Sequence, residues 1–96
     1  MRVRLSRRAQ ADVREILRYS VQNWGILQGG SYLDQLDELL QRLASGERKG
    51  CIIDGLRPGI ERITYRSHFL FYERTESLLS VVRILHQSMD ARRHLG

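Results

Sequence analysis

The side chains best suited to chemistry lie in the C-terminal half of the chain. They are three arginines that can bind anions and three residues that can move a proton or donate a hydrogen bond: Arg62, Arg66, Arg83, His68, Tyr72 and His86. Metal-free RNA cleavage needs a base for the 2′-hydroxyl proton, an acid for the 5′-oxygen and guanidinium groups for the charge on phosphorus. Arg62, Arg83 and His86 are the candidate catalytic residues for such a reaction.

Ion pairing is the interpretation that we favour for the same arginines. Glu61, Glu73, Glu76 and Asp90, or an acidic partner, can neutralise them, and the histidines then make ordinary hydrogen bonds. Phosphate-loop, dinucleotide, nucleophile-elbow and zinc-protease motifs do not occur in the chain. The single cysteine, Cys51, can form no intramolecular disulfide, and no Cys/His cluster has zinc spacing. We therefore expect neither a metal nor a cofactor.

The chain is basic in an unusual way. Sixteen Lys and Arg residues against eleven Asp and Glu give a net charge of +5, and only Lys49 among the sixteen is a lysine. This charge favours an acidic partner, and a DNA-binding module is one hypothesis. A cluster at Arg2, Arg4, Arg7 and Arg8 lacks interleaved aromatic residues, so a solvated face is the interpretation that we favour for it. With no signal or membrane-spanning segment, the sequence predicts a cytoplasmic protein.

The elements that must position these residues begin with a short edge strand at residues 1–5. Ser6 is a candidate N-cap for an amphipathic helix that runs to Trp24, with Gly25 at the corner. A second helix is predicted from near Ile26 to about residue 44, although Gly29 and the glycine after it leave open a later start or a frayed first turn. So short a link makes the two helices an antiparallel hairpin.

The second half of the chain is predicted to form a meander. A loop with apolar anchors spans residues 45–59, strands follow at 60–67, 68–74 and 78–86, and residues 87–96 form a basic tail. The 96 residues thus make one α+β domain with both helices on one face of a small sheet. On this prediction Leu70 and Tyr72 lie on the other face. Either the loop around Ile52, Ile53 and Leu56 covers that face or a partner docks there, and we favour the partner.

Short motifs along nearly the whole chain add a resemblance. They are Leu5-Ser6-Arg7-Arg8-Ala9, Trp24-Gly25, Gly55-Leu56-Arg57, Ser67-His68, Phe71-Tyr72, the run from Val82 to Asp90, and His94-Leu95. Their order and spacing resemble the ParE toxins of the RelE/ParE superfamily, which act in type II toxin–antitoxin systems. The fold of that family, a helical hairpin against a small, mainly antiparallel sheet (β-α-α-β-β-β), agrees with the elements predicted above.

The resemblance implies a function and partners. It implies a toxin, not an enzyme, that inhibits DNA gyrase and blocks replication. It also implies a hetero-oligomer with a ParD-like antitoxin, which has a ribbon-helix-helix part and a disordered acidic C-terminal part, so that DNA is reached only through the antitoxin and no membrane is involved. Toxicity is carried over to Arg83, His86, Met89, Asp90, Arg92 and Arg93. The antitoxin is expected on Leu17, Trp24, Leu33, Arg62, Arg66, Leu70 and Tyr72.

A ribosome-dependent mRNA endonuclease of the RelE type is the alternative within the same superfamily. Those relatives look richer in Lys and Arg across the sheet, whereas this chain has one lysine, in a loop. His86 is the residue that keeps this alternative open.

Overall fold

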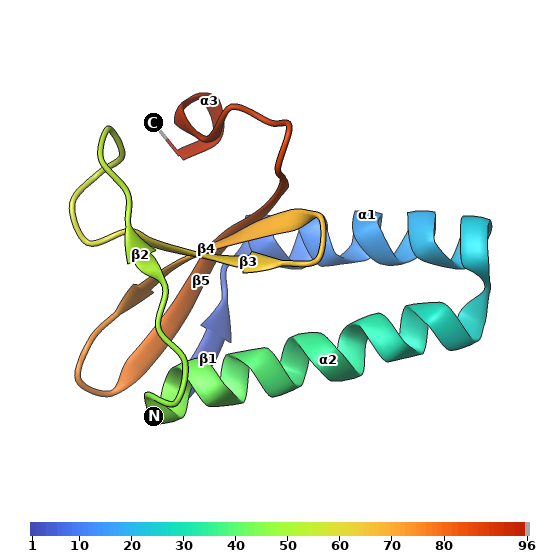
Figure 1. Ribbon diagram of the computed structural model, residues 1–96, viewed down its shortest axis with the longest axis horizontal. Coiled ribbons are helices and arrows are strands. Elements are labelled where there is room, and N and C mark those ends of the chain that lie inside the picture. Colours follow the sequence, from blue (N-terminus) through green and yellow to red (C-terminus); the bar gives the residue numbers. More distant parts are fainter. Residues whose placement is uncertain (96) are drawn as a thin grey trace.

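The computed structural model describes residues 1–95 as a helical hairpin joined to a mixed sheet (Figure 1). The elements in chain order are β1 (Arg2–Leu5), α1 (Arg7–Trp24), α2 (Ile26–Ser45), β2 (Cys51–Ile52), β3 (Glu61–Tyr65), β4 (His68–Arg74), β5 (Leu78–His86) and α3 (Ala91–Leu95). The predicted α+β class, the hairpin and the three C-terminal strands are confirmed. No helix within residues 1–95 combines the length and the apolar character that crossing a membrane requires.

The hairpin is set by one cap and one glycine corner. Ser6 caps α1, because its side-chain oxygen accepts a hydrogen bond from the Ala9 amide at 3.0 Å. Gly25 then separates the helices with a φ of +92°, a backbone conformation that favours glycine. From this corner α2 begins at Ile26, so the later start that the glycines left open does not occur.

Gly29 belongs to α2 because the two helices approach closely there. A Cβ atom on Gly29 would lie 2.9 Å from Cγ2 of Val21 on α1, whereas a Cβ on Gly30 would meet nothing within 4 Å. The close contact between the helices thus offsets the low helix propensity of Gly29.

The sheet has the strand order β1-β5-β4-β3-β2. β1 runs parallel to β5 at one edge, and the other neighbouring pairs are antiparallel. β1 is an edge strand, as predicted. The short β2 at the opposite edge was not predicted, because its two residues are held by pairing with β3 and not by a pattern of their own.

Both faces of the sheet are covered. Leu70 and Tyr72 are fully buried in the core under the helices, with Leu36, Leu40 and Leu79 among their neighbours in that cluster. The prediction that Leu70 and Tyr72 lie on the face away from the helices is therefore wrong. Alternation along β4 showed which residues share a face, but β4 is apolar on both faces and so gave no sign of which face the helices cover.

The second face carries a smaller core in place of a docking surface. Ile60, Phe71 and Leu85 are buried there, under Leu56 of the loop and Ala91 and Leu95 of the C-terminal segment. Figure 1 shows α3 on the side of the sheet away from α2. The partner that we favoured for this face is thus replaced by the chain itself, and residues 91–95 of the predicted tail form a packed helix.

The hairpin corner generates a stability prediction. Gly30→Ala should raise the free energy of unfolding by about 0.5–1 kcal/mol, because alanine loses less backbone entropy in a helix and its methyl group meets open space. Gly29→Ala should be less stable than Gly30→Ala, since its methyl group must displace Val21. Urea denaturation followed by circular dichroism measures both. Equal stabilisation by the two variants would contradict the close approach of the helices.

Candidate functional site

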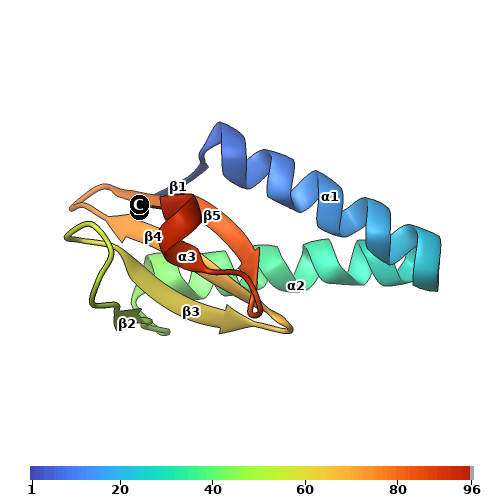
Figure 2. The same ribbon diagram turned by 90° about the horizontal axis from the view of Figure 1, so that it is seen from above.

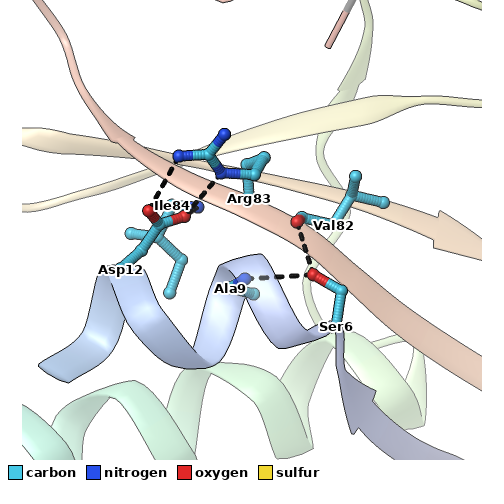
Figure 3. A network of polar contacts seen from close by, with 6 residues as sticks. All are labelled: Ser6, Ala9, Asp12, Val82, Arg83 and Ile84. Carbon is cyan, nitrogen blue, oxygen red and sulfur yellow. Dashed lines mark hydrogen bonds and ion pairs between the residues drawn. The ribbon is translucent and has the colours of Figure 1, made fainter. Parts of the chain in front are cut away.

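The last half of β5 is completed at its edge by α1 and not by another strand (Figure 3). Pairing with β1 ends at Val81, opposite Leu5. Beyond that point the Ser6 amide donates to the Val81 carbonyl at 2.9 Å, and the Ser6 hydroxyl donates to the Val82 carbonyl at 2.7 Å. The Ser6 that caps α1 therefore also extends the edge pairing of β5.

Asp12 is the second attachment of α1 to β5. Its carboxylate accepts two hydrogen bonds from the Arg83 guanidinium, at 2.8 and 2.9 Å, and a third from the Ile84 amide at 2.9 Å (Figure 3). The side chains of Asp12 and Arg83 are each only 14% exposed. The hydrogen bonds with Asp12 raise the pKa of Arg83, so its guanidinium stays charged and occupied.

The three candidate nuclease residues do not come together. The Arg83 guanidinium is held by Asp12, and Arg62 places its guanidinium carbon 4.0 Å from the centre of the Phe69 ring. His86 instead faces His68, with 5.4 Å between ring centroids. Ion pairing, which we favoured for the arginines, holds for Arg83, although its partner is Asp12 and not one of the four acidic residues named from the sequence.

His86 lies in a groove between the helical hairpin and the ends of the strands. This aromatic groove has a volume of about 660 Å³ and combines hairpin side chains with strand-end side chains: Ile16, Tyr19, Trp24, Tyr32, Arg66, His68 and His86. Tyr19 and Trp24 pack edge to face at its rim, and Trp24 is 63% exposed. Such a large exposed tryptophan beside a hollow is typical of a binding surface.

Among the polar side chains that line the groove, Arg66 and Tyr32 have unusual surroundings. Arg66 has a φ of +55°, the one positive value outside glycine in residues 1–95, and it donates to the Gln35 side chain at 2.7 Å. The Tyr32 hydroxyl is buried with no hydrogen-bond partner among the described residues, while the Tyr32 backbone carbonyl accepts from Tyr65 at 2.6 Å. Burial raises the pKa of Tyr32, so the hydroxyl keeps its proton and is an unused donor.

The residues predicted to bind an antitoxin divide among several places. Trp24 and Arg66 line the aromatic groove, Leu33 is exposed on α2, and Leu17 is half-buried against the core. Arg62 lies against Phe69, outside the groove. Leu70 and Tyr72 are inaccessible beneath the helices, so their assignment to a binding surface is wrong.

Sequence reasoning did not assign Ile16, Tyr32 or His68 to this surface. Their helical and strand spacing is that of ordinary core residues, and only the fold brings them to one groove. Aromatic residues on both sides of the turn between the two helices are the one sequence signal that could have pointed to this groove.

Of the residues expected to carry toxicity, Arg83 and His86 belong to β5, and the other four follow it in an anchored segment. His86 accepts from the Ser88 amide through Nδ1 at 3.1 Å, and the Asp90 carboxylate accepts from the Arg92 amide at 3.0 Å. Met89, Arg92 and Arg93 are exposed, while Ala91 and Leu95 pack on the second core. Figure 2 shows this segment folding back so that α3 lies across β5. Arg83, by contrast, is turned inward to Asp12.

The histidine pair generates a pH prediction. Burial, and then the neighbouring His86, lower the pKa of His68 below its ordinary 6.5, with Asp12 acting in the opposite direction. The unfolded chain therefore binds more protons than the folded chain, so the contribution of His68 to stability is present above about pH 6.5 and is lost as the pH falls below it. His68→Gln should reduce the drop in urea midpoint between about pH 7.5 and about pH 5.5. An unchanged drop in the variant would contradict this assignment.

Comparison of the amino-acid sequence with known proteins finds one matching family and several relatives. The family described as "ParE toxin of type II toxin-antitoxin system, parDE" matches residues 3–91. The chain is 42% identical to Toxin ParE1 of Caulobacter vibrioides, covering 97% of this chain and 96% of that protein. It is 41% identical to Toxin ParE1 of Mycobacterium tuberculosis, covering 95% and 94%, and 34% identical to Toxin ParE of Escherichia coli, covering 90% and 84%.

Solved structures share the fold. A chain of the chromosomal ParDE system from P. aeruginosa superposes with a TM-score of 0.74 at 18% identity, over 90% of this chain and 95% of that one. A chain of the E. coli DinJ–YafQ complex gives 0.64 at 14% identity, over 92% and 96%. With the sequence matches over nearly its full length, these likenesses lead to one conclusion: the chain belongs to the ParE toxin family of type II toxin–antitoxin systems.

Proposed function

We propose that this toxin inhibits DNA gyrase by binding it in the cytoplasm, and that a ParD-like antitoxin neutralises it as a hetero-complex. Membership of the ParE family supports the toxin role. Binding without catalysis is supported by one observation, the capture of Arg83 by Asp12. A guanidinium with a bidentate carboxylate partner and little exposure is not free to stabilise charge on a scissile phosphate.

The segment after β5 is the surface that we assign to gyrase. Met89 is 41% exposed and Arg92 follows three positions later, on a segment fixed from within by Ala91 and Leu95. Because this packing orders the segment before binding, a target that binds it loses little conformational entropy.

The aromatic groove is the surface that we assign to the antitoxin. Trp24 and Tyr19 offer apolar area, and Arg66 offers charge. An acidic segment that folds on binding needs both: apolar burial to offset its ordering entropy, and positive charge to speed its encounter. The ParDE and DinJ–YafQ structures contain toxins of this fold in toxin–antitoxin systems, which supports a hetero-complex here.

Supercoiling of relaxed plasmid by purified gyrase tests the target. Wild-type toxin should inhibit it, and the double variant Met89→Ala, Arg92→Ala should need about 30-fold more protein, the size expected for interface hot spots. Arg18→Ala is the matched control, because Arg18 is an exposed arginine on α1 whose partner, Glu15, lies three residues away. Folded wild-type toxin that leaves supercoiling unaffected would contradict gyrase as the target.

Titration of the cognate antitoxin tests the groove. Trp24→Ala should weaken its binding by about 30-fold, because truncating an aromatic hot spot typically costs 2 kcal/mol or more. Leu27→Ala is the control, since Leu27 is 91% exposed on the same hairpin and outside the groove. Equal effects of the two substitutions would refute the groove as the antitoxin site.

An mRNA endonuclease is a second candidate, and the His68–His86 pair favours it. The two rings lie in the groove with Arg66, a set that combines two groups able to move a proton with a cation. Ribosome-programmed mRNA cleavage tests this candidate. Cleavage that is lost in His86→Ala while the fold persists would replace gyrase binding as the proposed activity.

A further inference from the structure

We propose that this toxin also contacts the phosphodiester backbone of duplex DNA directly, through a basic recess between the start of α1 and α3. The family resemblance implied that DNA is reached only through the antitoxin, whereas the net charge of +5 left a DNA-binding module as one hypothesis. The recess goes beyond the proposed gyrase inhibition, because duplex binding by the isolated chain is measurable with no gyrase present.

The basic recess is a hollow of about 460 Å³ with arginines from four segments in its walls: Arg7 and Arg8 of α1, Arg57 of the loop, Arg83 of β5, and Arg93 of α3, beside which His94 also lines it. It shares no lining residue with the aromatic groove. The groove's rim residue Trp24 is at the opposite end of α1, 17 residues after Arg7, which is about 25 Å along the helix. The two surfaces can therefore be occupied at the same time.

The charge of the recess is only partly neutralised. Asp12 binds Arg83, and Glu73 approaches Arg57 to 2.9 Å. In residues 1–95, by contrast, no carboxylate lies within ion-pair distance of Arg7, Arg8 or Arg93. No Asp or Glu among the described residues lines the recess either. Three guanidinium groups thus face one hollow and select an anionic occupant.

The chemistry of the lining favours a phosphate backbone. Guanidinium groups bind phosphate oxygens through two parallel hydrogen bonds. No aromatic side chain of residues 1–95 except His94 lines the recess, so it offers little to stack a splayed base and fits a duplex better than a single strand.

An acidic peptide is a poorer match for the same hollow. Val82 and Leu95 are its only large apolar residues, so little apolar burial is available to offset the ordering entropy of a flexible peptide. A duplex is ordered before it binds. The walls are also held in place, α1 by the Asp12 contacts and α3 by Ala91 and Leu95 on the second core. Such a preorganised cationic surface contacts phosphates without regard to sequence.

Fluorescence polarisation with a labelled duplex of about 20 base pairs, at several salt concentrations, tests the proposal. Three phosphate contacts predict a slope of about −2.7 in log K against log salt, so wild-type affinity should fall roughly 40-fold between 50 and 200 mM. The triple variant Arg7→Gln, Arg8→Gln, Arg93→Gln should lose most of this slope. The control triple Arg14→Gln, Arg48→Gln, Lys49→Gln makes the same change in net charge outside the recess and should keep it.

Three results would overturn the proposal, with circular dichroism establishing that every variant is folded. No binding of the duplex at 50 mM salt is one. Equal loss in both triple variants is another, because it would assign the binding to overall charge. The third is displacement of the duplex by polyglutamate at an equal or lower concentration of charge, which would make the recess a site for acidic polypeptide. None of these depends on whether the toxin inhibits gyrase.

Discussion

The rest of the structure depends on the hydrogen bonds that the Asp12 carboxylate of α1 accepts from β5. β5 is longer than its parallel neighbour β1, so its last residues would present an unpaired edge. Asp12 satisfies the Ile84 amide and the Arg83 guanidinium there, and Ser6 satisfies the carbonyls of Val81 and Val82 just before them. Without these partners the edge would carry half-buried polar groups, each costing about 1–3 kcal/mol. α1 therefore replaces a strand at this edge.

This attachment places the surfaces of the toxin relative to one another. The start of α1 forms one wall of the basic recess, and its far end forms the rim of the aromatic groove. The segment that follows β5 leaves from the same strand and folds onto the opposite face of the sheet. One helix fixed to one strand thus separates an aromatic surface suited to an antitoxin from a basic surface suited to a target and its DNA.

The sequence predicted elements more reliably than faces and contacts. Periodicity located the hairpin and the last three strands because each buries a regular stripe. It failed for Leu70 and Tyr72, since β4 is apolar on both faces and the pattern does not show which face the helices cover. β2 and α3 are too short for a periodic signal and depend on contacts with distant residues. The Asp12–Arg83 pair, whose members are 71 positions apart in sequence, carried no local signal.

The most direct test of this account is a double-mutant cycle on Asp12 and Arg83, measured as the free energy of unfolding of the wild type, Asp12→Ala, Arg83→Ala and the double variant. Both side chains are 14% exposed and joined by two hydrogen bonds. The account predicts a coupling of about 2 kcal/mol, well above the 0.3–0.5 kcal/mol within which independent sites add. A coupling inside that range would contradict the claim that this pair holds α1 to the sheet.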